Sequence, residues 1–417
     1  MSSYIIEGGK RLEGEVYVSG SKNASLPIMA ASILSGKTST LYNVPNIYDT
    51  KTTMNILELL GCKVSKKNGK IIIDSSDIKT QEIPYELMRK MRSSVVLAGA
   101  IIGRFKNAVF SYPGGCDIGT RPIDLHLKGF QKIGIEIEES SGVIKCSADK
   151  ITGNDIHLDF PSVGATENLI LAAVLAEGVT TISNAAMEPE ILDLQDFLNK
   201  MGAKVEGAGT NIIKITGVKK LRDVSYNIMP DRIEAGTLLC MAAITGGEVI
   251  VNNVRMEHIN PILHKLEETG SRITLSRNNV VIEAPKRLKA VDIKTMPYPG
   301  FQTDMQSVFS SMLTVAKGTS MIVENIFENR YKYINELIRM GAKITTEGKV
   351  AIVKGVRKLV ASEVKATDLR GGAAMCTAAL VAKGVTKINN IEHILRGYEN
   401  LDKKLNKLGA SIKVENF

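Results

Sequence analysis

The feature that most constrains the fold is an internal repeat that runs through the whole chain. One phrase, in which an amphipathic stretch ends at a glycine and an alternating apolar stretch follows, occurs six times. Its glycines are Gly61, Gly134, Gly202, Gly270, Gly341 and Gly409. They are spaced 73, 68, 68, 71 and 68 residues apart, so six copies of roughly 70 residues fill the 417-residue chain. This period is longer than that of most solenoid repeats and therefore indicates a repeated subdomain.

Each copy predicts the same order of secondary structure. In MGAKVEGAGTNIIKI, from Met201, a helix ends at a glycine and two short strands form a hairpin. A second phrase, such as VAKGVTKINNI from Val381, alternates with the first and predicts a buried helix, a glycine turn and a β-branched strand. Each copy thus reads β-α-β-α-β-β, and its glycines are predicted to be structural. Six copies predict an α/β fold of two pseudo-threefold domains, with a ligand site in the cleft between them.

Composition limits the classes of function. The chain has 53 Lys and Arg against 44 Asp and Glu, a net charge of +9, but these residues form no dense basic runs. Nucleic-acid binding is therefore not expected, whereas a basic cleft for small anions and a merely solvated basic surface both fit. The longest apolar run, residues 95–103, is too short to span a membrane and predicts a buried helix. Because the N-terminus lacks a signal-peptide pattern, we expect a cytoplasmic protein without a membrane partner.

The spacing of the cysteines and histidines in the sequence does not predict a metal site. None of the five cysteines belongs to a CxxC pair, and the five histidines show no paired ligand spacing. Cys116 stands apart because it lies in YPGGCDIGTRP, a loop rich in glycine and proline with Arg121 close by. An exposed thiol beside a cation is reactive because its pKa is lowered. The alternative is that Cys116 is a small buried apolar residue.

A lysine opens one of the predicted buried helices. In SGSKNASLP, Lys22 and Asn23 precede an apolar stretch, and Ser21 is a plausible helix cap. A lysine at a helix N-terminus opposes the helix dipole, but it is tolerated where an anion also binds. The alternative is an ordinary solvated lysine.

An aspartate and an arginine-rich group also depart from the repeat. Asp304, in PGFQTDMQ, is interpreted either as a general base or as a first-turn helix residue. Arg330, Asp368, Arg370 and Arg396 follow, and the planar guanidinium group suits carboxylates and phosphates. Because Arg330 and Arg396 occupy comparable loops of neighbouring copies, we expect them to converge on one site. Ordinary surface ion pairs are the alternative.

Together these segments resemble the UDP-N-acetylglucosamine 1-carboxyvinyltransferase (MurA) family of enolpyruvyl transferases. The matching phrases are SGSKNASLP, KMRSS, PGGCDIGTRPIDLHL, PSVGATEN, TDMQ, NIFENRY, ELIRMGA, ATDLRGGAAM and RGYE. The cysteine phrase is specific, because the related 5-enolpyruvylshikimate-3-phosphate synthases share the fold without it. The resemblance implies a two-domain inside-out α/β barrel with its active site in the interdomain cleft. It implies that residues 21–228 form one domain and residues 1–20 and 229–417 the other.

The resemblance also implies an activity and roles for its chief residues. The reaction is transfer of the enolpyruvyl group of phosphoenolpyruvate to the 3′-hydroxyl of UDP-N-acetylglucosamine, with release of phosphate, in the first committed step of peptidoglycan synthesis. No metal or organic cofactor is implied. Cys116 resembles the family's general acid and nucleophile, carried on a closing lid and alkylated by the antibiotic fosfomycin. Asp304 resembles the base near the 3′-hydroxyl.

The remaining site residues follow from the same resemblance. Lys22, Arg121 and Arg396 are expected to hold phosphoenolpyruvate, because a polyanion needs several cations. Asn23 is expected near the reaction intermediate, with Arg330, Asp368 and Arg370 as supporting residues. The expected nucleotide-sugar contacts are Arg92, Arg121, Pro122, Ile123, Asp124, Leu125, Ser162, Val163, Gly164 and Ile326.

Two other functions remain open. One is an enolpyruvyl transferase that acts on a different acceptor. The other is an inactive paralogue that only binds a nucleotide sugar, although the joint presence of Lys22, Cys116, Asp304 and Arg396 argues against it.

Overall fold

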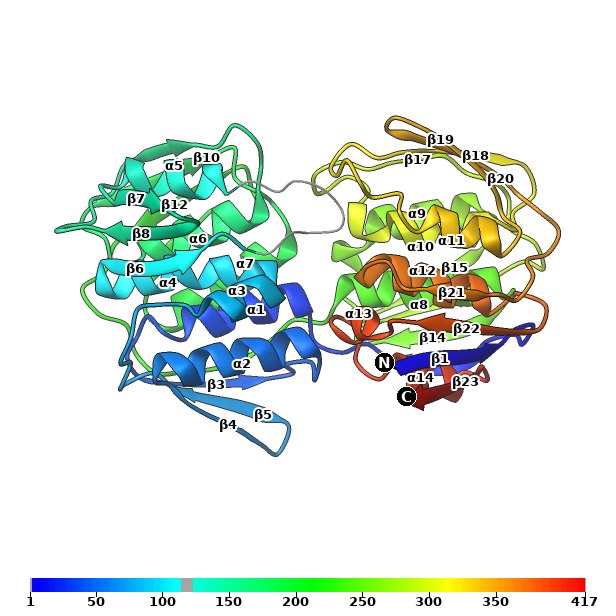
Figure 1. Ribbon diagram of the computed structural model, residues 1–417, viewed down its shortest axis with the longest axis horizontal. Coiled ribbons are helices and arrows are strands. Elements are labelled where there is room, and N and C mark those ends of the chain that lie inside the picture. Colours follow the sequence, from blue (N-terminus) through cyan, green and yellow to red (C-terminus); the bar gives the residue numbers. More distant parts are fainter. Residues whose placement is uncertain (1, 114–122, 417) are drawn as a thin grey trace. The chain divides into compact units, whose positions relative to one another are not determined.

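The computed structural model describes residues 2–113 and 123–416. These residues form two compact units. The 20–229 unit contains the described residues of that range, and the 230–416 unit also contains residues 2–19. In Figure 1 the blue strand at the start of the chain therefore lies among the red elements of the 230–416 unit.

Sheets of one common pattern form the 230–416 unit. Its strands are β1 (Ser2–Glu7), β2 (Glu13–Tyr17), β14 (Glu248–Asn252), β15 (Arg272–Ser276), β16 (Asn279–Glu283), β17 (Ile293–Lys294), β18 (Thr319–Val323), β19 (Lys343–Glu347), β20 (Val350–Lys354), β21 (Glu363–Lys365), β22 (Val385–Asn389) and β23 (Ser411–Asn416). Among the described residues they form sheets of order β15-β16-β14-β2, β17-β18-β20-β19 and β21-β22-β1-β23. Each sheet combines one parallel pair with two antiparallel pairs.

Buried helices occupy the interior of the 230–416 unit. The helices are α8 (Arg232–Ile244), η2 (Met256–His258), α9 (Asn260–Glu268), α10 (Thr303–Leu313), α11 (Ile334–Arg339), α12 (Leu369–Ala379), α13 (Glu392–Leu395) and α14 (Leu401–Lys407). Helices α8, α10 and α12 pack against one another, and every residue of α8 is buried. A helix buried on all sides belongs in a core. Helices α8, α10 and α12 therefore lie inside the unit and the sheets outside, as in an inside-out barrel.

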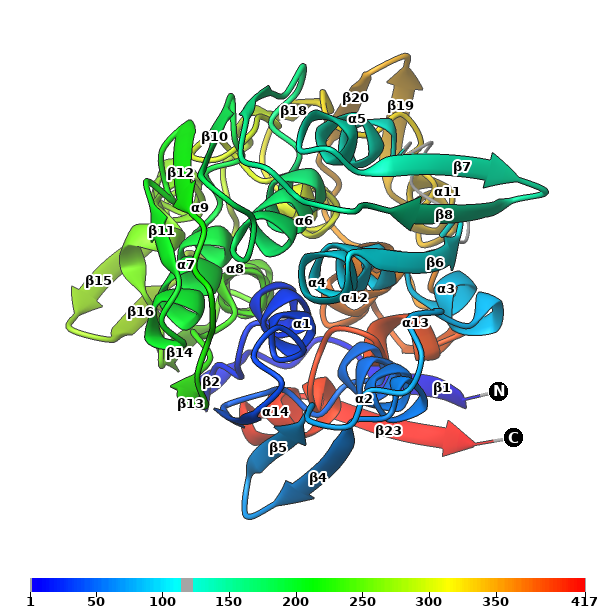
Figure 2. The same cartoon turned by 90° about the vertical axis from the view of Figure 1, so that its left-hand side faces the viewer.

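The 20–229 unit follows the same plan. Its strands are β3 (Thr38–Tyr42), β4 (Lys63–Lys67), β5 (Lys70–Asp74), β6 (Asn107–Ser111), β7 (Glu136–Ser140), β8 (Val143–Ser147), β9 (Asp155–His157), β10 (Val179–Ser183), β11 (Lys204–Glu206), β12 (Ile212–Thr216) and β13 (Val224–Asn227). Its helices are α1 (Lys22–Ala31), α2 (Tyr48–Leu60), α3 (Tyr85–Lys90), η1 (Arg92–Val95), α4 (Val96–Phe105), α5 (Asp124–Lys132), α6 (Val163–Ala173) and α7 (Pro189–Lys200). The sheet orders are β13-β3-β5-β4, β11-β12-β10-β9 and β6-β8-β7. Figure 2 shows α1, α4 and α6 in the middle of the unit, with these sheets around them.

The predicted repeat is confirmed by the order of elements. Residues 155–216, for example, run β9-α6-β10-α7-β11-β12, which is the predicted β-α-β-α-β-β. The six repeated glycines all have positive φ, between 89° and 110°. Residues with a β-carbon rarely adopt this conformation, so these glycines have the structural role expected of them. The longest apolar run is likewise the buried helix α4.

The sixth copy of the repeat is completed by the start of the chain. Strand β23 ends the described chain, and it pairs in antiparallel register with β1, so that Ser2 lies opposite Asn416. Strand β2 completes a different sheet by pairing in parallel with β14. Both ends of the chain therefore contribute to the 230–416 unit.

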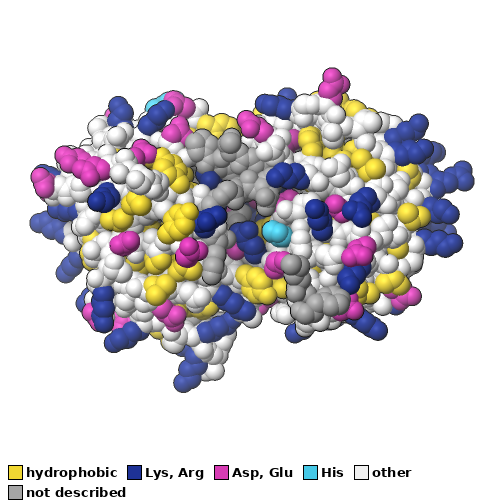
Figure 3. Space-filling view, viewed as in Figure 1, with side chains coloured by type: hydrophobic (Ala, Val, Ile, Leu, Met, Phe, Trp, Pro, Cys, Tyr) yellow, Lys and Arg dark blue, Asp and Glu magenta, His cyan; other side chains and the backbone are white. Residues whose placement is uncertain are grey.

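Charge and hydropathy fit this architecture. In the described part of the chain, no helix combines the length and hydropathy that crossing a bilayer requires. On the face drawn in Figure 3, Lys and Arg side chains gather along the right-hand edge, and over the rest of the face they are interspersed with Asp and Glu.

Candidate active site

In the 230–416 unit, two buried arginines hold the carboxylate of Asp304. Asp304 lies in the first turn of α10. Its Oδ1 accepts hydrogen bonds from Arg330 Nη2 at 3.1 Å and from Arg370 Nε at 3.2 Å. The arginine side chains are only 3% and 4% exposed, whereas that of Asp304 is 31% exposed. Two adjacent cations stabilise the ionised carboxylate, which still reaches solvent.

The two arginines are themselves fixed by their surroundings. Arg330 Nη2 also donates to the carbonyl of Thr303 at 3.1 Å. Asp368 caps α12 by accepting hydrogen bonds from the backbone N–H groups of Arg370, at 2.9 Å, and Gly371, at 3.1 Å. The interpretation of Arg330 and Arg370 as surface ion pairs is therefore wrong, because both are buried.

Arg370 is a permanent positive charge. Its burial lowers the pKa, but Tyr398, Asp304 and Asp231 raise it by more, so the pKa of Arg370 lies above its usual value. The guanidinium carbon also lies 5.3 Å from the centre of the Tyr398 ring. A fixed guanidinium of this kind can bind a carboxylate or phosphate.

Two further predicted residues of this unit lie on neighbouring segments. Arg396 is the C-cap of α13, which packs against α12, the helix that carries Arg370. Its convergence with Arg330 stays a prediction. Ile326 follows β18, and its backbone N–H donates to Oε1 of the buried Glu324 at 2.8 Å. No sequence motif pointed to Glu324.

In the 20–229 unit, Lys22 is part of a largely buried ion pair. Ser21 caps α1 by accepting a hydrogen bond from the backbone N–H of Ala24 at 3.3 Å, as predicted. Lys22 Nζ lies 3.0 Å from Asp49 Oδ2, and the two side chains are 13% and 4% exposed. Lys22 is therefore not an ordinary solvated lysine. Asp49 was missed because an aspartate in the first turn of a helix is common on structural grounds alone. Asn23 follows Lys22 in α1 and is half-buried.

The predicted nucleotide-sugar contacts of this unit gather at helix starts. Ser162 caps α6 by accepting a hydrogen bond from the backbone N–H of Ala165 at 3.4 Å. Helix N-termini favour anions. The predicted residues at the starts of α5 and α6 are Ile123, Asp124 and Leu125, and Ser162, Val163 and Gly164.

A buried asparagine connects these helix starts. Asn168 of α6 is fully buried. Its Nδ2 lies 2.7 Å from His126 Nδ1, in α5, and donates to the carbonyl of Val95, in η1, at 3.0 Å. Its Oδ1 accepts from the backbone N–H of Gly99 at 2.8 Å. Arg92 begins η1, the short helix that ends at Val95. The hydrogen bond from Asn168 to Val95 therefore connects Arg92 to helices α5 and α6 as well.

Part of the predicted site lies outside the described residues. This applies to Cys116, Arg121 and Pro122, and to the predicted lid. Burial raises the pKa of Cys62, Cys146 and Cys376 to about 12 and that of Cys240 well above its usual value. The four cysteines that the structure describes are thus protonated at neutral pH and unreactive.

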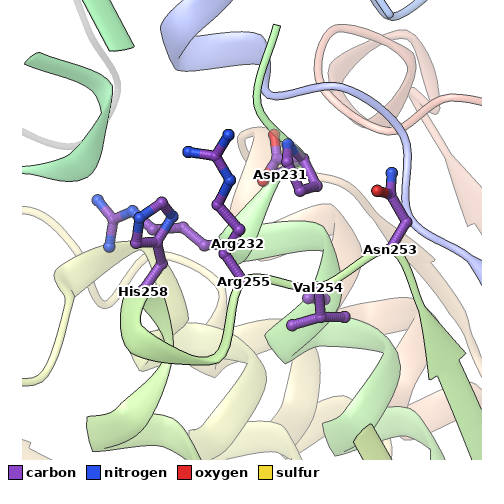
Figure 4. Close-up of a pocket in the computed structure, with 8 residues that line it drawn as sticks. Asp231, Arg232, Asn253, Val254, Arg255 and His258 are labelled. Carbon is purple, nitrogen blue, oxygen red and sulfur yellow. The ribbon is translucent and has the colours of Figure 1, made fainter. Parts of the chain in front are cut away.

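A small pocket in the 230–416 unit was not predicted (Figure 4). It is lined by Pro230, Asp231, Arg232, Ala235, Asn253, Val254, Arg255 and His258. Burial lowers the pKa of His258 to about 4; Arg255 and Arg232 act in the same direction and Glu257 opposes them. The imidazole of His258 is therefore neutral at pH 7.

Comparisons with known proteins identify the family. A family model described as EPSP synthase (3-phosphoshikimate 1-carboxyvinyltransferase) matches residues 6–405. UDP-N-acetylglucosamine 1-carboxyvinyltransferase 2 of Caldanaerobacter subterraneus subsp. tengcongensis is 55% identical over 413 residues, covering 99% of both chains. The chain belongs to the UDP-N-acetylglucosamine 1-carboxyvinyltransferase family. Another relative of that name, from Trichlorobacter lovleyi, is 50% identical over 415 residues and 99% of both chains.

Solved structures show that this UDP-N-acetylglucosamine 1-carboxyvinyltransferase family member has the enolpyruvyl transferase fold. The enolpyruvyl transferase NikO of Streptomyces tendae matches with a TM-score of 0.89 at 24% identity, over 99% of this chain and 98% of its own. EPSP synthase of Acinetobacter baumannii matches over 100% of both chains with a TM-score of 0.77 at 18% identity. The predicted fold class is confirmed.

Proposed function

We propose that the chain transfers the enolpyruvyl group of phosphoenolpyruvate to the 3′-hydroxyl of UDP-N-acetylglucosamine, releasing phosphate in peptidoglycan synthesis. The observation that carries the proposal is the 55% identity, over 99% of both chains, to a protein named for this activity. The ion pairs of the buried Arg330 and Arg370 with Asp304 support the proposal, because they combine fixed cations with an ionised carboxylate. We place the enzyme in the cytoplasm with these two small-molecule substrates.

The reaction has definite chemical requirements. Carbon C3 of phosphoenolpyruvate takes up a proton, which makes C2 electrophilic, and the sugar hydroxyl loses its proton as its oxygen bonds to C2. The tetrahedral intermediate then loses phosphate from C2 and a proton from C3, which restores the double bond. The site must therefore supply an acid, a base and several cations for the phosphate and carboxylate groups.

Residues of the 230–416 unit supply the base and some of the cations. Asp304 accepts the proton of the sugar hydroxyl, because its carboxylate is ionised and reaches solvent. Arg330 and Arg370 hold that carboxylate in one orientation. Arg396 binds the carboxylate or phosphate of phosphoenolpyruvate.

Residues of the 20–229 unit supply further binding groups. Lys22, kept in place by Asp49, binds an anionic group of phosphoenolpyruvate, and Asn23 binds the intermediate. The starts of α5, α6 and η1 bind the nucleotide sugar. The roles of Cys116 as acid and nucleophile, and of Arg121 as a further cation, rest on the resemblance of their loop to the family.

A second candidate function is the same transfer to shikimate 3-phosphate. It is favoured only by the description of the family model, which names a 3-phosphoshikimate 1-carboxyvinyltransferase. The greater similarity to the UDP-N-acetylglucosamine enzymes makes it the weaker candidate.

The decisive experiment measures phosphate release from phosphoenolpyruvate. Purified protein is given either UDP-N-acetylglucosamine, shikimate 3-phosphate or no acceptor, and the products are identified by mass spectrometry. We expect release only with UDP-N-acetylglucosamine, accompanied by the enolpyruvyl ether of that sugar. Release only with shikimate 3-phosphate, or binding of the sugar nucleotide without any release, would overturn the proposal.

A further inference from the structure

Four of the repeats share a feature at the end of the strand that lies between a parallel and an antiparallel neighbour. In four copies the residue that follows the strand is an asparagine with φ between 55° and 61°. In three of these copies, its side-chain Nδ2 donates to a carbonyl just after the neighbouring parallel strand. These bonds are Asn43 to Ile228 at 2.9 Å, Asn184 to Leu158 at 2.7 Å and Asn253 to Val18 at 2.9 Å. The asparagine therefore clamps two strands together for structural reasons.

The copy built on β18 departs from this pattern. Val323 ends β18 opposite Val350, just as Asn252 ends β14 opposite Asn279. The next residue is Glu324, which lacks the left-handed backbone of the asparagines. In this copy the bond to the neighbouring strand comes from the following residue, Asn325, whose Nδ2 donates to the carbonyl of Thr295 at 3.0 Å. The fold alone does not require a glutamate at this position, because four other copies have an uncharged asparagine there.

Glu324 is buried and fully engaged in hydrogen bonds. It is 2% exposed. Its Oε1 accepts from the hydroxyl of Thr295 at 3.0 Å and from the backbone N–H groups of Ile326, at 2.8 Å, and Phe327, at 3.1 Å. Its Oε2 accepts from the hydroxyl of Thr303 at 3.0 Å. Backbone N–H groups and hydroxyl groups donate these bonds, so both carboxylate oxygens of Glu324 have hydrogen-bond partners.

These bonds join two segments of the candidate active site. One is the loop that carries Ile326, a proposed nucleotide-sugar contact. The other is the first turn of α10, where Thr303 immediately precedes Asp304 and gives its carbonyl to Arg330. We infer that Glu324 is a positioning residue that fixes the main chain at Ile326 and, through Thr303, the orientation of Asp304. The inference rests on the proposed function.

Variants separate the two connections. Thr303→Val removes only the hydroxyl that bonds to Glu324, while Thr303→Ser keeps a hydroxyl. Glu324→Gln keeps one oxygen for the N–H groups of the loop but presents an amide toward Thr303. Glu324→Ala removes both connections. The matched control is Glu336→Gln, because Glu336 is also buried in this unit and accepts the backbone N–H of Lys365 at 3.2 Å.

The kinetic expectations differ from those of a merely structural glutamate. We expect Thr303→Val and Glu324→Gln to lower kcat about tenfold, with KM for phosphoenolpyruvate nearly unchanged, since the proton transfer depends on the orientation of Asp304. Thr303→Ser should restore kcat. Glu324→Ala should also raise KM for UDP-N-acetylglucosamine about tenfold, because the Ile326 loop loses its anchor. Glu336→Gln should leave kcat and both KM values as in the unmodified enzyme.

Each outcome decides for or against the inference. An unchanged kcat in Thr303→Val, no recovery in Thr303→Ser, or an equal loss in Glu336→Gln would overturn it. Thermal unfolding shows whether each variant is folded. If the unmodified protein releases no phosphate, the proposed function fails instead. Calorimetry of UDP-N-acetylglucosamine binding then tests, without turnover, whether Glu324 fixes the loop that carries Ile326. For the inference to stand, Glu324→Ala must bind this sugar nucleotide more weakly than the unmodified protein does.

Discussion

At the scale of single residues, the candidate site depends on charges that are paired before any substrate arrives. Lys22 lies against Asp49, and Asp304 lies between Arg330 and Arg370. Such partners hold a buried charged group in one orientation. A substrate anion can then bind to groups that are already in place.

The Lys22–Asp49 pair gives a test at this scale. Asp49→Asn removes the carboxylate that faces a largely buried ammonium group, so we expect the free energy of unfolding to fall by about 2 kcal/mol. We also expect KM for phosphoenolpyruvate to rise, because Lys22 is no longer held in position. Denaturant unfolding and the phosphate-release assay measure the two effects. The double variant Lys22→Met/Asp49→Leu should recover the stability but not the activity; recovery of both would contradict the assigned role of Lys22.

Sequence motifs predicted local features of the site but not its long-range partners. Ser21 as a helix cap and Asp304 in the first turn of a helix follow from neighbouring residues. Asp49 and Glu324 became visible only in the folded chain, because their roles depend on residues from other segments. Cys116 has a strong motif, but its surroundings lie outside the described residues.

At the scale of elements, periodicity predicted the helices and strands well, and the exception has a local cause. In the second copy, the first strand is reduced to a bridge between Glu82 and Val109. Pro84 follows closely and has no N–H to extend the ladder. Pro84 is instead the N-cap of helix α3.

Helices α6 and α7 bring acidic residues together in the core of the 20–229 unit. Glu167 of α6 is buried, and Glu190 of α7 is buried as well. Burial, together with the charges of Glu190 and Glu188, raises the pKa of Glu167 well above 4.5. The folded state therefore keeps this proton to a higher pH than the unfolded state does.

This shift predicts a pH dependence of stability. The contribution of Glu167 to the free energy of unfolding is largest below pH 4.5, where this group is protonated in both states, and falls as the pH rises toward its folded-state pKa. Because glutamine cannot ionise, Glu167→Gln should be more stable than the unmodified protein at pH 8, with a smaller difference at pH 5. Urea unfolding at both pH values measures this. Glu136 is exposed, so Glu136→Gln is the control and should not alter the profile. Parallel profiles for Glu167→Gln and the unmodified protein would contradict the shift.

At the scale of the whole molecule, the repeat predicted the secondary structure of each unit but not the pairing of the first strand with the last. The period shows six copies, yet the sixth phrase ends the sequence after one hairpin strand. The missing strand is β1, and its pairing with β23 joins residues from opposite ends of the chain. Periodicity carries no information about such a pairing. The resemblance to the family was needed to assign the first strand to the second domain.

Strands β1 and β23 are antiparallel neighbours, as the two strands of a hairpin are. Ser2 lies opposite Asn416, so two residues, 417 and 1, would close the loop between these strands if the ends were joined. The hairpin of β4 and β5 has the same geometry, because Lys67 lies opposite Lys70. Its turn is Asn68–Gly69, with φ of 51° and 73°. This dipeptide favours the tight turn that suits antiparallel strands.

We therefore predict that the chain tolerates circular permutation at these sites. In the permutant, Asn-Gly replaces residues 417 and 1 and joins Asn416 to Ser2, and the chain is opened between Asn68 and Gly69. We expect it to fold and to release phosphate at nearly the unmodified rate, because every strand keeps its neighbours.

A permutant opened between Ile71 and Ile72 is the control. It should fail to fold, since β5 pairs with strands on both sides. Circular dichroism, thermal unfolding and the phosphate assay compare the proteins. An unfolded permutant opened at Asn68 would show that an intact β4–β5 turn, or free chain ends, are required for the sheets to assemble.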